Sequence, residues 1–486
     1  MNNYRPTIGL EIHAELKTQT KMFCDSKNDA DEKRPNVNIC PICMGHPGTL
    51  PVINKEAVKH VLRMGVAVGG EIADFTEFDR KNYFYPDIPK GYQISQYKYP
   101  LVSGGKINDV ELTRVHLEED TARSSHDTGD CNSSVHPGGC SLVDFNRAGV
   151  PLMELVTEPV IHSAEEAVAF AKELQLLLQY LGASDANMEK GEMRVEANIS
   201  VSETEKFGTK VEVKNLNSFR AVERAISYEI ARHIEVLEKG EKILQETRGW
   251  DENKQKTFSQ RSKENAHDYR YFPDPDLPKL MISKVPEFDQ KTLKKSLPEL
   301  PWEKRVRYEK SFGLKKQDTN FLVDNPAYAH FFETAIEGFE KNKKTVELVA
   351  NYLTSDVVGW VNKQNLTISG EQIGKLTPKN LTAVIKMIID GKLSSRGAKD
   401  IIEDVIVSGK DAEKVATDKN LIQKNDSGEL SKIIEKIISE NQKAADEYKA
   451  GKQASLQFLI GQGMKVTKGS ANPEMLKTLF LKSLGK

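Results

Sequence analysis

The chain of 486 residues is 38% hydrophobic and 29% charged and has a formal net charge of −2, the balance of a globular protein of about three domains. It contains no apolar run of the roughly 18 residues that a membrane helix needs and no secretory or transit signal, so we expect a cytoplasmic protein without membrane association. Residues 1–290 hold 36 basic and 46 acidic side chains, and residues 291–486 hold 33 basic and 25 acidic ones. This charge asymmetry suits a protein that holds a polyanion with its basic end and modifies it with its acidic body.

The first 270 residues are predicted to form several half-buried strands. In residues 7–16, apolar residues alternate strictly with polar ones such as Glu11 and His13, and the same alternation recurs in residues 194–201 and 209–214. A strand with one apolar and one polar face is typical of an antiparallel sheet. We therefore predict an antiparallel sheet for this part of the chain.

Two helices are predicted among these strands. The capping box Ser163-Ala-Glu-Glu166 begins one helix, which Gly182 ends. The second follows Ser218 and ends at Gly240.

A proline-rich segment marks the main predicted domain boundary. Six of the 20 prolines lie within residues 273–301, a density that neither a helix nor a central strand tolerates. Beyond it the chain is predicted to be helical, with clear helix starts at Thr377-Pro378 and Asn472-Pro473, and a second boundary falls near residues 405–412. The predicted domains are a cradle over residues 1–292, a helical domain over 293–408 and a helical tail over 409–486.

The polar face of the first strand is a candidate metal site. Glu11, His13 and Glu15 share this face, and residues 114–120 and 151–158 add further carboxylates. Carboxylates with an imidazole suit a hard cation such as Mg²⁺, which in turn binds nucleotide phosphates; the alternative is a solvated sheet face. The sequence has no G-x-x-x-x-G-K-[ST] loop and no G-x-G-x-x-G motif, so metal-bridged carboxylates and scattered basic groups would have to hold any ATP.

Residues 79–87 combine opposite charges with aromatic side chains. Together with residues 89–96 they are suited to line a pocket for a charged ligand. The alternative is a polar loop with aromatic anchors.

The five cysteines are an odd number in a long chain, which argues against a disulfide framework. Three of them supply ligands for a tetrahedral zinc site, Cys24, Cys40 and Cys43, the last two in a Cys-Pro-Ile-Cys knuckle. Ser26 stands where a Cys-x-Cys pair would have its second cysteine, so Asp25 or His46 would have to complete the set. The alternative is a group of free thiols.

Long motifs resemble one family, the B subunit of the tRNA-dependent amidotransferases (GatB). They are IGLEIHAELKT (8–18), CPICMGHPGTLPVIN (40–54), FDRKNYFYPDIPKGYQISQ (78–96), RVHLEEDTAR (114–123), VDFNRAGVPLMELVTEP (143–159), KNLNSFRAVERAISYEI (214–230), QETRGWD (245–251), DYRYFPDPDLP (268–278) and IGQGMKVTKGSANPEML (460–476). The resemblance therefore covers essentially the whole chain.

The resemblance implies a fold and an activity. The implied fold class is α+β, an antiparallel-sheet cradle resembling the glutamine-synthetase-like fold, followed by all-α helical and tail domains. Proteins of this family work in a heterotrimer with a glutaminase, the A subunit, and a small clamp-like C subunit, as ATP-dependent carbon–nitrogen ligases with glutamine as amido donor. The B subunit phosphorylates the side-chain carboxylate of Glu-tRNA(Gln) or Asp-tRNA(Asn). Ammonia from the glutaminase then displaces the phosphate, giving Gln-tRNA(Gln) or Asn-tRNA(Asn).

The family motifs also imply metal ligands, with ATP and Mg²⁺ as cofactors. The implied Mg²⁺ ligands are Glu11, His13, Glu119 and Glu154. Strict alternation would instead place Glu118 on the face of Arg114 and His116, although a bulge at the strand end would exchange the two glutamates. The family motif favours Glu119. Zinc-binding members carry a cysteine at the position of Ser26, and other members lack all of these cysteines, so the resemblance leaves zinc open.

Two further sets of residues are implied to contact substrate. Asp79, Arg80, Lys81 and Asn82 would lie around the nucleotide and the aminoacyl end, with Arg147, Arg194, Asn198 and Lys214 as additional contacts. Lys81 would meet phosphate or the substrate carboxylate as a point charge. For the additional four, a structural ion pair is the alternative.

The tail is implied to bind the misacylated tRNA. Lys465 and Lys468 would meet phosphates beside Gly463 and Gly469, which allow a close backbone approach; the alternative is a solvated helical hairpin. Two other functions stay open at this point: a non-catalytic tRNA-binding scaffold subunit, and a small-molecule amide ligase, which would leave the basic tail unexplained.

Overall fold

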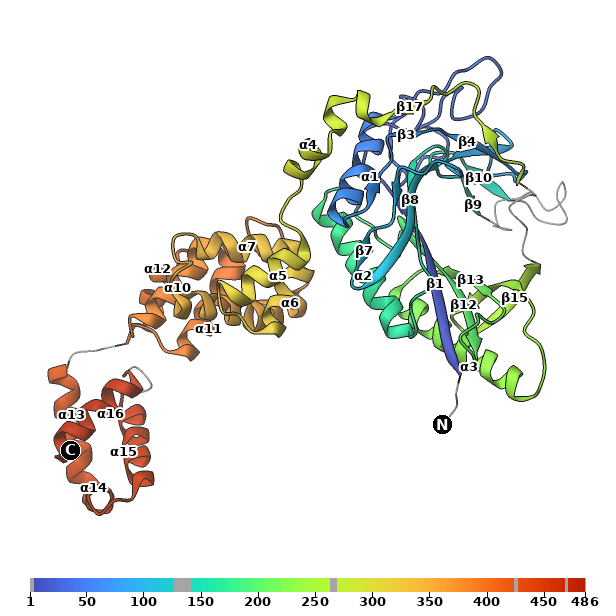
Figure 1. The fold of residues 1–486 in the computed structure, drawn as a ribbon. Helices are drawn as coiled ribbons and strands as arrows, with labels where there is room; N and C mark the ends of the chain where they lie inside the picture. The colour runs from blue at the N-terminus through green and yellow to red at the C-terminus, as the bar shows by residue number, and fades with distance from the viewer. Residues whose placement is uncertain (1–3, 126–140, 263–268, 424–426, 468–470, 486) are drawn as a thin grey trace, which may run out of the picture. The chain divides into compact units, whose positions relative to one another are not determined.

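The structure, a computed structural model, describes residues 4–125, 141–262, 269–423, 427–467 and 471–485. The chain divides into two compact units, residues 1–300 and 301–486 (Figure 1). The first unit combines a large sheet with helices, and the second is helical. This confirms the predicted order of an α+β N-terminal part followed by a helical C-terminal part.

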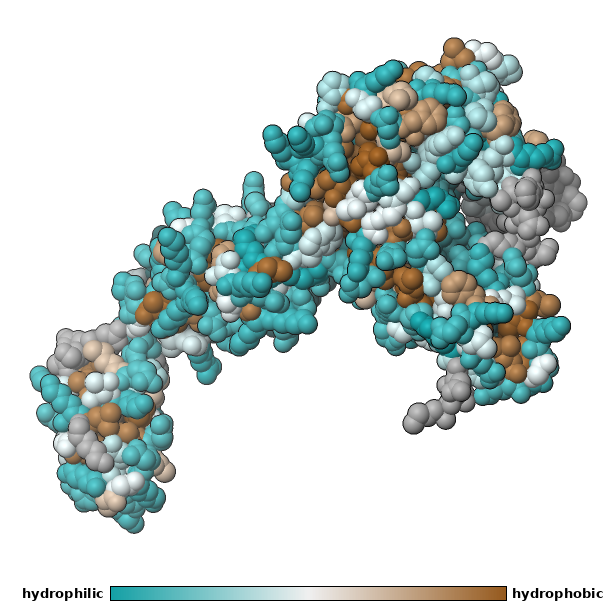
Figure 2. Space-filling view, in the orientation of Figure 1, coloured by the Kyte–Doolittle hydropathy of each residue, from teal (hydrophilic) through white to brown (hydrophobic). Residues whose placement is uncertain are grey.

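No helix in the described ranges is long and apolar enough to cross a membrane. Figure 2 shows a largely hydrophilic surface on the visible face, with apolar side chains in separate patches. The cysteines at positions 131 and 140 lie outside the described residues.

A ten-stranded sheet forms the body of the first unit. Its strands pair antiparallel in every described ladder except β13–β14, which is parallel. The alternation of polar and apolar residues had predicted antiparallel pairing only. In spatial order they are β15 (Lys256–Ser262), β14 (Glu246–Asp251), β13 (Val211–Leu216), β12 (Met193–Ser202), β1 (Arg5–Glu15), β11 (Pro151–Thr157), β8 (Val110–Glu119), β6 (Val102–Ser103) and β2 (Glu71–Ile72), with β7 (Lys106–Ile107) also paired to β8.

The strict alternation of β1 places its two kinds of side chain on opposite faces. Ile8, Leu10 and Ile12 are fully buried, and three helices lie along one side of the sheet: α1 (Lys55–Ala67), α2 (Ala164–Tyr180) and α3 (Phe219–Glu238) (Figure 1). The polar residues of β1 are thereby left on the other face.

The predicted ends of α2 and α3 are confirmed. Ser163 caps α2 by accepting a hydrogen bond from the backbone N–H of Glu166, and Ser218 caps α3 in the same way. Each helix is followed by a glycine with positive φ, Gly182 and Gly240, the conformation that glycine adopts without strain.

Short strands cover part of the polar face. A three-stranded sheet joins β16 (Phe272–Pro273), β4 (Asp79–Asn82) and β5 (Tyr92–Ser95), and β5 contacts β8. Residues near 272 thus lie beside residues near 80, although about 190 residues separate them in sequence. Two further pairs are β9 (Arg123–Ser125) with β10 (Leu142–Asp144) and β3 (Phe75–Thr76) with β17 (Leu280–Met281).

The proline-rich segment is folded onto the first unit. It contains the 3₁₀ turns η2 (Ile282–Lys284) and η3 (Pro286–Phe288) and the helix α4 (Gln290–Lys295). α4 spans the predicted boundary at residue 292 and packs against α1, where Arg63 donates a hydrogen bond to the carbonyl of Ser296.

The second unit consists of short helices. These are α5 (Pro301–Lys310), α6 (Lys316–Asp324), α7 (Pro326–Ile336), α8 (Lys343–Tyr352), the π-helix η4 (Leu353–Val357), α9 (Val358–Gln364), α10 (Pro378–Ile389), α11 (Ser395–Ser408), α12 (Ala412–Asp418), α13 (Ser427–Glu440), α14 (Gln442–Lys449), α15 (Gln453–Val466) and α16 (Pro473–Leu484). α12 follows the predicted boundary at 408 but packs against α10 and α11, which precede it. A separate apolar core gathers residues between Leu430 and Leu484. The three-domain division stays a prediction.

A buried carboxylate joins α3 to the edge of the sheet. Glu229 is fully buried. It accepts hydrogen bonds from Arg232 at 2.7–3.1 Å and from Thr257, with Arg248 at 3.1 Å and His233 at 3.3 Å. Burial alone would raise the pKa of Glu229, but the bonds from His233, Arg232 and Thr257 outweigh it and lower the pKa to about 2.

We expect Glu229→Gln to lower the free energy of unfolding by about 3–5 kcal/mol at pH 7, because the variant leaves buried cations without their anion. A carboxylate with a depressed pKa stabilises the fold above its ordinary pKa of 4.5 and loses that effect as the pH falls toward 2. The stabilities of the wild type and the variant should therefore converge as the pH falls through this window. Urea unfolding at several pH values measures this, with the exposed Glu235→Gln on the same helix as the control; a difference independent of pH would contradict the prediction.

Candidate functional site

Four neighbouring strands place charged side chains in one row across the polar face. In the register, His13 of β1 lies opposite Arg194 of β12 on one side and Glu154 of β11 on the other. Glu154 in turn lies opposite His116 of β8. Because each of these strands alternates with period two, residues in one row point to the same face of the sheet.

His13, Glu154 and His116 of this row meet Glu11 and Glu118 of the same face in a compact carboxylate–imidazole group. The Nε2 atom of His13 lies 3.5 Å from Glu154, 3.7 Å from Glu118 and 3.9 Å from Glu11. The Nε2 atom of His116 lies 3.3 Å from Glu154. Glu118, Glu154 and His116 are buried, so these charges are not solvated as on an ordinary polar sheet face.

The charges within this group shift one another's pKa values. Burial lowers the pKa of His13, but the hydrogen bond and charge of Glu154, with the charge of Glu118, outweigh it and raise the pKa to about 9. Burial also acts to raise the pKa of Glu154, yet His116 and His13 hold it well below its usual range. Burial and the charge of Glu154 raise the pKa of Glu11. A metal cation here would displace the proton of His13, because a ligating imidazole must be neutral.

The donor set fits a hard divalent cation. The ligand atoms of Glu11, His13 and Glu154 lie within 4.8 Å of one another, as do those of His116, Glu118 and Glu154. An ion held at about 2.1 Å has its ligand atoms within about 4.2 Å of one another, so small side-chain shifts would close either set. A third group, Glu11 with Glu196 and Glu212, meets the same distance criterion. Carboxylate oxygens dominate all three, as Mg²⁺ prefers.

The adjacent residues Glu118 and Glu119 point to opposite sides of the strand. Glu118 joins the carboxylate–imidazole group and accepts a hydrogen bond from Ser95 at 3.1 Å. Glu119 pairs with Lys90 and accepts a hydrogen bond from the backbone N–H of Ile94 at 2.9 Å. The structure therefore brings Glu118, and not the expected Glu119, to His13. Residues 117–119 of β8 continue their regular pairing with β11, so no bulge exchanges the two.

Of residues 79–82, Lys81 is the one aimed at this group. The charges of Glu118 and Glu154 act on it and, against the effect of burial, raise its pKa well above the usual range. Arg80 instead forms ion pairs with Asp274 at 2.7 Å and Asp276 at 2.9 Å.

The flanking residues Asp79 and Asn82 have backbone partners. Asp79 is buried and accepts a hydrogen bond from the backbone N–H of Tyr97. Asn82 donates to the carbonyls of Tyr269 and Arg270. Both side chains fix the loops around the group rather than face it.

Arg194 and Arg147 lie together at a second carboxylate. Arg194 donates to both oxygens of Asp120 at 3.0 Å, and Arg147 lies 3.6 Å from the same carboxylate. Glu15 is also here, and burial with the charge of Asp120 raises the pKa of Glu15 to about 8. The ion-pair alternative is therefore what the structure describes for these two arginines.

Lys214 lies on β13 and Asn198 on β12, where Asn198 is opposite Glu212 in the register. Lys214 pairs with Glu196 at 2.8 Å and lies 3.9 Å from Glu212, beside the third carboxylate group. Within the part of the chain that is described, no hydrogen bond reaches the buried side-chain oxygen of Asn198.

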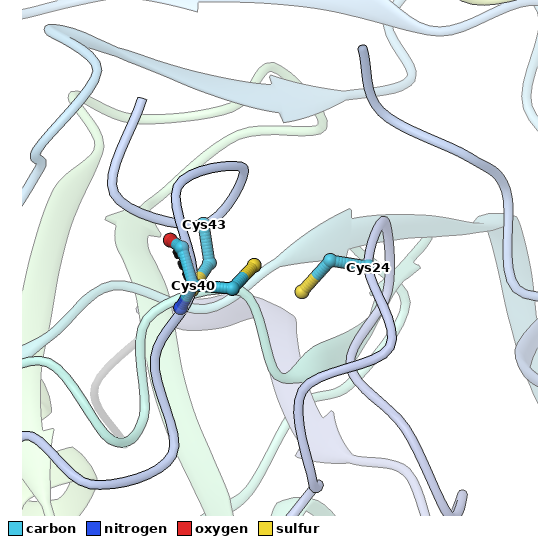
Figure 3. Close-up of side chains that lie close together, drawn as sticks. All are labelled: Cys24, Cys40 and Cys43. Atoms are coloured by element: carbon cyan, nitrogen blue, oxygen red, sulfur yellow. Dashed lines mark hydrogen bonds between the residues drawn. The ribbon is translucent and has the colours of Figure 1, made fainter. Parts of the chain in front are cut away.

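The three predicted zinc ligands do come together (Figure 3). The sulfur atoms of Cys24, Cys40 and Cys43 lie within 4.8 Å of one another. The hydrogen bond from Cys24 lowers the pKa of the Cys43 thiol to about 5. Structural zinc takes four ligands. The sulfur of Cys43 contacts the backbone of Cys40 at 3.1 and 3.4 Å, and the Ser26 hydroxyl and the Lys21 ammonium each lie 4.0 Å from it. Among the described residues these three cysteines form the whole group, one ligand fewer than a closed zinc site needs.

The described part of the tail places one predicted tRNA contact on the surface. Lys465 is exposed in the last turn of α15, whereas Lys468 and Gly469 lie outside the described residues. Gly463 faces α16, where an added Cβ would lie 3.0 Å from Leu476. Its small size therefore serves helix packing.

Sequence reasoning missed several neighbours of the group. His116 and Glu118 carried a signal in the alternation of residues 114–118, which the family motif overrode. Tyr83, Tyr269 and Tyr271 surround Lys81, and nothing in the sequence indicated that residues 269–271 would lie beside residues 79–83.

Comparisons with known proteins agree over the whole chain. The model of the GatB/GatE catalytic domain matches residues 6–286, and the model of the GatB domain matches residues 330–484. Proteins named as the B subunit of aspartyl/glutamyl-tRNA(Asn/Gln) amidotransferase are similar to it at nearly full length. Those of Carboxydothermus hydrogenoformans and Persephonella marina are each 42% identical, over 100% and 98% of both chains, and that of Brevibacillus brevis is 43% identical over 99% of this chain and 98% of its own.

Proposed function

The chain belongs to the GatB/GatE family, and from that membership we propose that it is the B subunit of a tRNA-dependent amidotransferase. It uses ATP to phosphorylate the side-chain carboxylate of Glu-tRNA(Gln), Asp-tRNA(Asn) or both, and then amidates that carboxylate with ammonia. The observation that carries the proposal is the buried carboxylate–imidazole group of Glu11, His13, Glu118 and Glu154.

The proposed reaction has two steps. A carboxylate is a poor acyl donor because its leaving group would be oxide. In the first step, an oxygen of the substrate carboxylate attacks the γ-phosphorus of ATP, and the bond to ADP breaks. In the second step, the nitrogen of ammonia attacks the carbonyl carbon, the carbon–oxygen bond to phosphate breaks, and inorganic phosphate and one proton leave. The products are ADP, phosphate and the amide.

We assign the residues around the group separate parts in these steps. Glu11, Glu118 and Glu154 with His13 would hold Mg²⁺, which when bound neutralises phosphate charge and keeps the phosphoryl group in line with its acceptor. Lys81 brings an ammonium into the field of the same group, since the charges of Glu118 and Glu154 help to raise its pKa. It would attract the substrate carboxylate and the transferred phosphoryl group as a point charge.

We propose that partners complete the enzyme. The relatives are named as one lettered component of an amidotransferase, which implies further subunits. A glutaminase, the A subunit, would supply ammonia, and a small C subunit would support assembly. The fold would be the glutamine-synthetase-like cradle of the family. The exposed Lys465 on α15 and the basic second unit are proposed to hold the tRNA, which raises the effective concentration of its aminoacyl end at the catalytic unit.

The test is ATP hydrolysis by the assembled complex with Mg²⁺. We expect hydrolysis to be stimulated by Glu-tRNA(Gln) or Asp-tRNA(Asn) and not by uncharged tRNA, and the stimulating species names the substrate. Equal rates with charged and uncharged tRNA, from a folded complex that binds tRNA, would overturn the kinase assignment and leave a scaffold subunit.

A further inference from the structure

Five tyrosines form a continuous row beside the carboxylate–imidazole group. Ring centroids lie 5.9 Å apart for Tyr85–Tyr83, 5.8 Å for Tyr83–Tyr269 and 6.0 Å for Tyr269–Tyr271. Tyr271 and Tyr97 stack in parallel, with centroids 4.4 Å apart and planes at 11°. We call these five residues the tyrosine row.

The inner part of the row adjoins the reacting group. The Lys81 ammonium lies 5.0 Å from the ring of Tyr269 and 5.7 Å from that of Tyr83. The charges of Glu118 and Glu154 act on the pKa of this ammonium and on that of Tyr271. A substrate carboxylate held at this group therefore lies next to the row.

The outer part of the row reaches the surface. Tyr85 and Tyr97 are about half exposed, and Phe84, between Tyr83 and Tyr85 in the sequence, is 85% exposed. Phe272, in the strand that follows Tyr271, is also exposed. Large aromatic side chains left exposed on neighbouring residues of the chain indicate a binding surface rather than a part of the core.

Exposed cations accompany these aromatic rings. Lys98 follows Tyr97 directly, and Arg270 lies between Tyr269 and Tyr271; both are exposed. Aromatic rings interleaved with cations are the chemistry that binds single-stranded nucleic acid, because unpaired bases stack on the rings and phosphates meet the cations.

We propose that the tyrosine row and Phe84 form a stacking surface for the unpaired 3′ nucleotides of the aminoacyl-tRNA. The inference rests on the proposed function, which requires an aminoacyl group at the carboxylate–imidazole group and hence the RNA end beside it. The surface holds the last bases, and the ester-linked amino acid continues inward past Lys81. Because stacking binds substrate and transition state alike, it lowers the KM for tRNA without raising kcat.

A double-mutant cycle tests this proposal. It measures the Kd of the assembled complex for tRNA while one protein side chain and the RNA 3′ end are changed singly and together. The variant is Phe84→Ala, and the two RNA probes are the cognate tRNA with its complete 3′ end and the same tRNA without its unpaired 3′ nucleotides. We expect Phe84→Ala to weaken binding of the complete tRNA about tenfold and to leave binding of the truncated tRNA unchanged. Phe84→Trp should restore binding, and the KM for charged tRNA should rise in the alanine variant with kcat unchanged.

Phe207→Ala is the matched control, since Phe207 is 70% exposed in the same unit and belongs to neither the row nor the carboxylate–imidazole group. Equal losses on complete and truncated tRNA, or no loss on either, would overturn the stacking surface. Loss of a partner protein from the Phe84→Ala complex would overturn it too and would make the patch a protein interface. Because the cycle measures only tRNA binding, it tests the stacking surface even if charged tRNA fails to stimulate ATP hydrolysis and the proposed function is wrong.

Discussion

Glu154→Gln is expected to abolish ATP-dependent amidation by the complex while tRNA binding is retained. Glu154 is the centre of the carboxylate–imidazole group: it contacts His13 at 3.5 Å, His116 at 3.3 Å and Arg114 at 3.3 Å. It belongs to two of the three carboxylate sets that could hold a metal ion among the described residues. Glutamine keeps the shape of the side chain but removes the negative charge that a divalent cation requires.

The size of the effect follows from metal chemistry. Loss of a partner that merely orients a metal ligand costs about 10–100-fold in affinity or activity, so loss of a direct ligand should cost at least about 100-fold in tRNA-stimulated ATP hydrolysis. The measurements are phosphate release, amidation of charged tRNA, and the Kd for tRNA.

A matched control separates this loss from misfolding. Glu158→Gln changes a carboxylate just beyond the end of the same strand, where Glu158 is half-buried and accepts a hydrogen bond from Thr113. That variant should keep full activity. Full activity in Glu154→Gln, or lost tRNA binding together with lost activity, would contradict the assignment of Glu154 to phosphoryl transfer.

The alternation in the sequence was enough to predict the faces of the large sheet. Residues of β1 and β12 lie on the predicted faces because a strand has an exact period of two and one side must be buried. The helix ends at Ser163 and Ser218 were predictable for a similar reason, since capping depends on residues next to each other in the chain.

The features that could not be predicted from the sequence depend on pairing between segments that are distant in the chain. The parallel β13–β14 pair and the sheet that joins β16 to β4 are set by tertiary packing, and local patterns do not record it. For the same reason, Arg80 was predicted to contact substrate. In the structure it forms ion pairs with Asp274 and Asp276, which lie almost 200 residues away in the sequence. The tyrosine row is assembled by this same distant contact, so it too has no local signal.

The clearest test of the site contrasts two neighbouring glutamates. Glu118→Gln is expected to raise the Mg²⁺ concentration at half-maximal activity at least about tenfold, because Glu118 lies 3.7 Å from His13 and completes the set with His116 and Glu154. Glu119→Gln should leave that concentration unchanged, because its carboxylate points to Lys90 on the other side of the strand.

Glu119→Gln should instead act on stability. Both Lys90 and Glu119 are buried, and removing one partner of a buried pair leaves the other charge uncompensated, at about 3–5 kcal/mol. Urea unfolding and a Mg²⁺ titration of ATP hydrolysis on both variants therefore distinguish the two roles within one strand. The opposite pattern, with a Mg²⁺ shift in Glu119→Gln alone, would mean that the strand end rearranges when the metal binds and would return the ligand assignment to the one that the family motif favoured.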